Sequence, residues 1–212
     1  MKLAKGASRP QPGEKKVVSG MDAVLIMIAS AAAAMATTAL AVSRIIGAFT
    51  RPVTLTLPLH APHQSPTGLG LDSEARYTTM EATIPALPTG ETILLAGAYA
   101  LNQVSFLAVA ALMFLLALRL RGQSLFTPGS VKIVAACGVV LALAGSLAQV
   151  LGSAARTRIA ELIGANQRTP GESILFVGEF NAVPLLAGIV LVLVAGVFQY
   201  GRRLQRDTEG LI

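Results

Sequence analysis

The chain has 212 residues, of which 53% are hydrophobic and 13% are charged, and its formal net charge is +6. Because soluble domains carry about 25% charged residues, this composition excludes an ordinary water-soluble protein and favours one that lies in a lipid bilayer. The single cysteine, Cys137, excludes an internal disulfide and any zinc or redox motif that needs several cysteines.

Four apolar stretches predict an all-α membrane protein, a four-helix transmembrane bundle that forms one domain. Each stretch provides the roughly 20 residues that a helical crossing needs. The predicted spans are residues 22–44, 92–119, 131–153 and 182–200. The first span follows a segment of residues 1–21 and is longer than the apolar region of a signal peptide, about 7–15 residues. A cleavable signal is the alternative interpretation of its alanine-rich sequence.

The connecting segments differ in length and pattern. The loop 45–91 is rich in proline and contains two alternating runs, PVTLTLPL and ARYTTMEATI, which predict short β-strands. The turn 120–130 is short and basic, with Pro128 suited to a first helical position. In the loop 154–181, the third helix is expected to continue to about Ile163, and SILFVG predicts another strand. Asn181 is expected to cap the last helix, with Pro184 in its first turn.

The basic residues predict the orientation. Eleven of the seventeen lysines and arginines lie in residues 1–21, in the turn and in the tail 201–212, counting Arg119 and Lys132 on either side of the turn. By the positive-inside rule these segments face the cytoplasm, so both termini are inside and the chain is a multi-pass protein of the plasma membrane. The positive charge then attracts anionic membrane lipid, and direct nucleic-acid binding becomes the weaker explanation.

No ionisable residue lies in the middle of a predicted span, which argues against pumps and coupled transporters. The spans do contain uncharged polar residues in their outer halves. One interpretation is hydrogen bonding between helices, and the other is a small polar pocket that opens outward and senses a ligand. The predicted intramembrane polar cluster consists of Thr38, Asn102, Gln103 and Gln149, with Thr37 beside it.

Small residues recur at every fourth position at Ser30, Ala34 and Thr38 and again at Gly138, Ala142 and Ser146. This spacing lets helix backbones approach closely. It serves packing within one chain or formation of a homo-oligomer, and the sequence leaves both open.

No motif for phosphate binding, nucleophilic catalysis or zinc proteolysis occurs in the chain. His60 and His63 are too few to predict a metal site. We therefore expect a protein that is not an enzyme and that has no cofactor and no metal.

Two segments resemble a bacterial membrane family, the domain of unknown function 2975. They are the turn RGQSLFTPGSVK, with Gly122, Phe126 and Thr127, and the ending FQYGRRLQRDTEGLI. In the ending the matching residues are Phe198, Gly201, Leu204, Asp207, Glu209, Gly210 and Leu211. The resemblance implies four membrane helices and, because relatives are often encoded beside a small helix-turn-helix regulator, a cytoplasmic regulator as partner. The candidate contact residues are Phe126, Arg202, Arg203, Arg206, Asp207 and Glu209.

These patterns together predict a non-enzymatic sensor or regulatory partner of a cytoplasmic protein. The alternatives are an accessory subunit of a larger membrane complex, held by other membrane subunits, and a small oligomeric transporter. Basic residues after the last span also serve to fix topology, whether or not a partner binds them.

Overall fold

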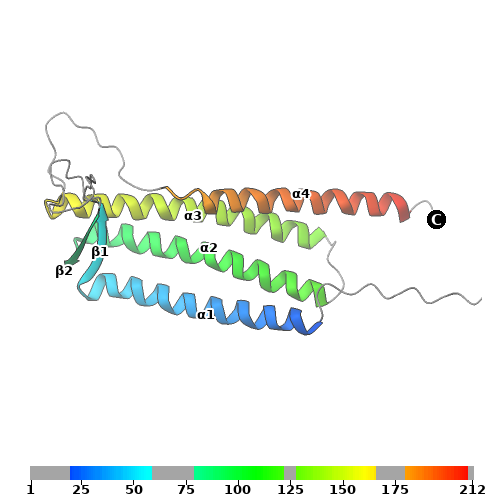
Figure 1. Cartoon of the computed structure of the whole chain (residues 1–212), viewed down its shortest axis with the longest axis horizontal. Helices are drawn as coiled ribbons and strands as arrows, with labels where there is room; N and C mark the ends of the chain where they lie inside the picture. Colours follow the sequence, from blue (N-terminus) through cyan, green and yellow to red (C-terminus); the bar gives the residue numbers. More distant parts are fainter. Residues whose placement is uncertain (1–19, 59–78, 122–127, 166–179, 210–212) are drawn as a thin grey trace, which may run out of the picture.

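A computed structural model of the chain describes residues 20–58, 79–121, 128–165 and 180–209. Within these residues the element order is α1 (Gly20–Thr50), β1 (Val53–Pro58), β2 (Thr79–Ile84), α2 (Thr89–Arg121), α3 (Pro128–Leu162) and α4 (Val183–Glu209) (Figure 1). Each of the four helices is long and apolar enough to cross a membrane. The expected helical architecture with four spans is therefore confirmed.

The helices pack in chain order, α1 on α2, α2 on α3 and α3 on α4 (Figure 1). In the described part of the chain α1 and α4 form no comparable interface with each other, so each has one helix neighbour. The two ends of this assembly differ. One end holds β1 and β2 and is called the hairpin end. The other, called the basic end, holds Arg119, Arg121, Lys132, Arg202 and Arg203.

Several local signals act as the sequence predicted. Helix α3 begins at Pro128 and continues without a break to Leu162, and Pro184 is the second residue of α4. The Asn181 side-chain oxygen accepts a hydrogen bond of 2.9 Å from the Val183 backbone N–H, which caps α4 as expected. Helix α4 also extends beyond Tyr200 as far as Glu209.

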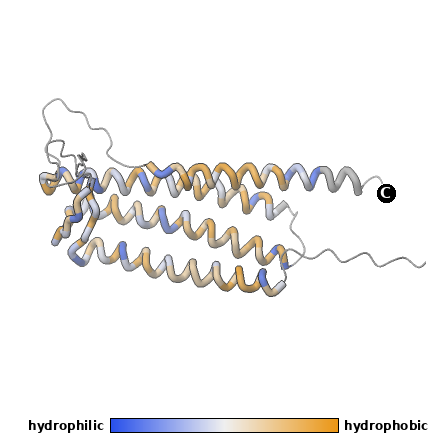
Figure 2. Tube along the Cα trace, viewed as in Figure 1, coloured by the Kyte–Doolittle hydropathy of each residue, from blue (hydrophilic) through white to orange (hydrophobic). Residues whose placement is uncertain are grey.

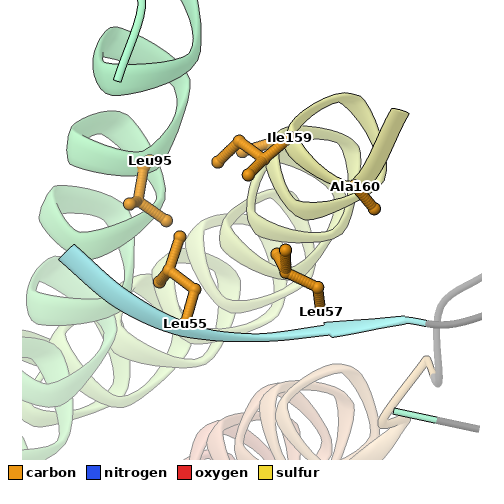
Figure 3. Packing of buried hydrophobic residues seen from close by; sticks show 6 residues of the cluster. Leu55, Leu57, Leu95, Ile159 and Ala160 are labelled. Carbon is orange, nitrogen blue, oxygen red and sulfur yellow. The ribbon is translucent and has the colours of Figure 1, made fainter. Parts of the chain in front are cut away.

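The two strands form an antiparallel hairpin in which Leu57 pairs with Met80 and Thr54 with Thr83. Side chains alternate between the faces of a strand, so Leu55 and Leu57 point inward while the Thr54 and Thr83 hydroxyls share a 2.9 Å hydrogen bond on the exposed face. Leu55 and Leu57 pack on Leu95 of α2 and on Ala155, Ile159 and Ala160 of α3 (Figure 3). The hairpin therefore covers the ends of α2 and α3.

The four helices consist largely of hydrophobic residues (Figure 2), and many of their large apolar side chains are exposed on the outside. Met35 is 69% exposed, Leu143 67% and Leu193 64%. Soluble monomers rarely expose a contiguous apolar surface of this extent, whereas a bilayer solvates it. The structure is that of a multi-pass membrane protein.

Some sequence predictions lie outside the described residues. They are the strand SILFVG, the histidine pair, and the residues of the family resemblance in the turn and at the end of the chain. The residues concerned are His60, His63, Gly122, Phe126, Thr127, Gly210 and Leu211.

Candidate functional site

The Gln103 side chain joins α2 to α1. Its amide nitrogen donates hydrogen bonds to the hydroxyls of Thr37, at 3.2 Å, and Thr38, at 2.9 Å. Both hydroxyls donate their own protons to carbonyls of the preceding helical turn, so they are free to accept. In the reversed orientation of the amide, its nitrogen donates to the Thr37 carbonyl at 3.2 Å. Either orientation connects the two helices at this depth.

The Gln149 side chain joins α3 to the residue that precedes α4. Its amide oxygen accepts from the Asn181 backbone N–H at 2.7 Å, and its amide nitrogen donates to the Asn181 carbonyl at 3.0 Å. The Gln149 amide thus bonds both the backbone N–H and the backbone carbonyl of Asn181, as a residue of a paired β-strand would. Asn181 in turn caps α4, so Gln149 positions the point at which the chain re-enters the apolar layer.

Asn102 lies apart from both contacts. It is exposed, whereas Gln103 and Gln149 are half-buried, and within the described ranges its amide has no hydrogen-bond partner. Adjacent residues of an α-helix are about 100° apart around the axis, which is why Gln103 reaches α1 and Asn102 does not. The predicted polar cluster is thus distributed over three places: Thr38 with Gln103, Gln149 alone, and Asn102 alone.

Both patterns of small residues lie at helix contacts within the chain. Ser30 is 4% exposed, and Ala34 is half-buried on the same face of α1. On α3, a Cβ atom added to Gly138 would lie 2.7 Å from the Gly188 carbonyl oxygen of α4. A Cβ added to Gly188 would meet Ala142 at 2.6 Å. These residues therefore pack α1 on α2 and α3 on α4.

Helix α4 forms a distinct surface at the basic end. Among the described residues, a hollow of about 350 Å³ is lined by Gly196, Gln199, Tyr200, Arg202 and Arg203 of α4. Gly196, Gln199, Tyr200 and Arg203 follow at spacings of three, one and three residues, which places them on one face of the helix. Two guanidinium groups beside a phenol and an amide provide donors for a carboxylate or a phosphate.

Of the predicted partner-contact residues, Arg202 is half-buried and Arg203 exposed. The backbone of Arg206, Asp207 and Glu209 continues α4, and Phe126 lies outside the described residues. The sequence prediction omitted Gln199 and Tyr200. Their spacing from Arg203, four and three residues, is the signal that would have identified them.

The fold and these contacts define a membrane protein with four apolar helices, a hairpin at one end and a basic helical extension at the other. No protein-family model, curated protein or solved structure matches the chain. The resemblance to the domain of unknown function 2975 family stays a prediction.

Proposed function

We propose that this chain is a non-enzymatic regulatory protein of the plasma membrane, and that the C-terminal part of α4 holds a cytoplasmic partner. One observation supports this most strongly: α4 runs unbroken from Val183 to Glu209 and projects beyond the ends of the other helices at the basic end (Figure 1). A helix that serves only as a membrane anchor can end at the apolar boundary. Helix α4 continues for further turns beyond that boundary, as far as Glu209.

The charge distribution supports the orientation that the proposal requires. Arg119 and Arg121 lie in the last turn of α2, Lys132 lies near the start of α3, and Arg202 and Arg203 follow the apolar part of α4, all at the basic end. Glu81, Glu91 and Glu161 lie at the hairpin end. The positive-inside rule places the basic end in the cytoplasm, where α4 can meet a cytoplasmic protein.

The surface chemistry of α4 favours an acidic partner. Arg202, Arg203 and Tyr200 line the same hollow, and arginine binds carboxylates with two parallel hydrogen bonds. The resemblance described above suggests a small helix-turn-helix regulator as that partner, with its acidic face on α4 and its basic DNA-binding face free. In this arrangement the membrane protein withholds the regulator and a signal releases it.

Affinity purification in a mild detergent tests the proposal. The full chain should recover one small cytoplasmic protein, and deletion of residues 201–212 should abolish its recovery. The double variant Arg202→Gln and Arg203→Gln should weaken binding by about tenfold or more, because each arginine–carboxylate hydrogen bond contributes roughly 1.5–3 kcal/mol when its partner is charged.

The double variant Arg156→Gln and Arg158→Gln is the matched control, since both arginines are exposed near the hairpin end of α3. It removes the same charge from the other side of the membrane and should leave recovery unchanged. Recovery of other membrane proteins, insensitive to the deletion, would instead indicate an accessory subunit. If anionic vesicles alone bind the tail and no protein is recovered, α4 contacts lipid and the regulatory proposal fails.

A further inference from the structure

Asn102 is a polar side chain on the outer surface of an apolar helix. It is exposed on α2, and no residue in the described part of the chain bonds to its amide. The other two amides of the predicted polar cluster are both engaged, Gln103 with α1 and Gln149 with Asn181. The contrast shows that this fold can satisfy an amide within the chain, and that the described residues do not do so for Asn102.

Asn102 lies within the hydrocarbon layer for any reasonable position of α2. Glu91 and Arg119 mark the polar ends of the helix and are about 42 Å apart along its axis, at about 1.5 Å per residue. Asn102 is about 17 Å from Glu91 by the same measure. A layer about 30 Å thick that fits between these two charges therefore always includes Asn102.

An amide in hydrocarbon requires a donor and an acceptor. Lipid tails provide neither, and an unsatisfied polar group there is costly. A second amide at the same depth provides both. A twofold axis parallel to the membrane normal brings any residue to the same depth in two copies of a chain, and a twofold interface is self-complementary by definition. Asparagine, which both donates and accepts, can pair with itself across such an axis.

We propose that two copies of this chain form a twofold dimer through the face of α2 that carries Asn102, with its amide hydrogen-bonded to Asn102 of the partner subunit. Phe106, Val109 and Met113 continue this face at spacings of four, three and four residues, the periodicity of a left-handed helix pair. Phe106 is 54% exposed and Met113 48%, so large side chains are free to pack beside the amide pair.

The hairpin limits the interface at one end. Leu95 and Tyr99 lie on the same face of α2, one to two turns toward the hairpin end, and both pack in the cluster under the hairpin. The open part of the face therefore begins at Asn102 and extends toward the basic end. Val104, on the opposite side of α2, is 45% exposed and has only apolar exposed neighbours such as Leu107, so it serves as a matched control position.

Cysteine cross-linking in native membranes tests the dimer. In a Cys137→Ser background, Phe106→Cys places a thiol one turn from Asn102 while keeping the amide, and Val104→Cys places one on the opposite face. Oxidation should link two copies of the chain through position 106 and not through position 104. Adding Asn102→Leu to the Phe106→Cys variant should weaken association by about tenfold. Adding Val104→Leu should leave it unchanged.

Asn102→Leu removes a polar group that has no partner among the described residues of the monomer. The variant should therefore fold at least as well as the parent, and a reduction in its cross-linking reports on association. The proposal is overturned if no cross-link forms, if positions 106 and 104 cross-link equally, if the thiol links to a different membrane protein, or if Asn102→Leu leaves the cross-linking undiminished. Binding of a partner by α4 is measured separately, so either proposal can fail alone.

Discussion

Glycine at two facing positions sets the distance between α3 and α4. The Gly138 and Gly188 backbones approach so closely that a Cβ on Gly138 would lie 2.9 Å from Leu191 Cβ, in addition to its contact with the Gly188 oxygen. Hydrophobic burial does not drive helix association inside a membrane, where lipid is as apolar as protein. Close contact and dispersion replace it, and only small residues permit such contact.

Gly188→Ala should therefore destabilise the protein, although alanine is the better helix former. The added methyl meets the Gly138 carbonyl and the Ala142 backbone, so α4 has to move away. Overpacking of this kind costs about 1–3 kcal/mol. The thermal unfolding midpoint in detergent should fall accordingly.

Gly196→Ala is the control on the same helix, because a Cβ there meets nothing within 4 Å. It should leave the midpoint unchanged or raise it slightly. Equal losses for the two variants would mean that glycine on α4 matters for backbone freedom and not for its contact with α3.

The residues of the predicted polar cluster illustrate what a sequence can and cannot specify. Hydropathy identified Asn102, Gln103 and Gln149 as amides within spans. Which of them meet depends on the rotation of each helix and on its neighbours, and these follow from packing between residues far apart in the chain. The local sequence pattern carries no information about helix rotation or about which helices are neighbours. The three amides therefore lie in three separate places and do not form the single cluster that the sequence predicted.

The hairpin shows that a short element can be specified locally and still depend on distant contacts. The alternation of threonine and leucine in residues 53–58 predicted β1, and the structure pairs it with β2. The surface under it could not be predicted, because Leu57 packs on Ile159 and Ala160, about 100 residues later in the chain. The extension of α3 that carries this surface did follow from its amphipathic pattern.

Leu57→Ala should loosen the hairpin. Leu57 is 0% exposed, and truncation of a buried leucine to alanine costs about 2–5 kcal/mol. Amide hydrogens of β1 and β2 should therefore exchange at least about thirtyfold faster. Mass spectrometry of the exchanged protein measures this directly.

Thr56→Ala provides the comparison on the same strand. Thr56 points to the exposed face, so its truncation should change exchange only slightly. A hairpin that exchanged at the same rate in all three proteins would not be held by the contact with α3.

In the molecule as a whole, each helix packs on the helices next to it in chain order, and the two ends of the assembly differ chemically. Four antiparallel helices place the start of α1 and the end of α4 at the same end (Figure 1). Hydropathy predicted the number of spans and charge predicted the orientation. Neither predicted that α1 and α4 would lie at opposite edges of the assembly with one neighbour each.

Reporter fusions test the orientation. Alkaline phosphatase, which is active only outside the cytoplasm, should be active when fused near Gly68 and silent after Gly122. The positive-inside rule is the physical reason, since Arg119 beside the turn 120–130 and Arg121 within it resist translocation. Activity after Gly122 with silence near Gly68 would reverse the assignment and remove the cytoplasmic role of α4.

The contact between β1 and α3 also determines when, during synthesis, the cluster under the hairpin can form. β1 leaves the ribosome before α2 exists, and its binding surface on α3 follows roughly 100 residues later, or about 5–20 s at common rates of synthesis. During that interval Leu55 and Leu57 lack the α3 part of their cluster and have only the contacts from the hairpin and α2. The cluster under the hairpin is complete only when α3 is present, and among the described residues it includes none from α4. Full burial of Leu55 and Leu57 therefore requires α2 and α3 and can precede the synthesis of α4.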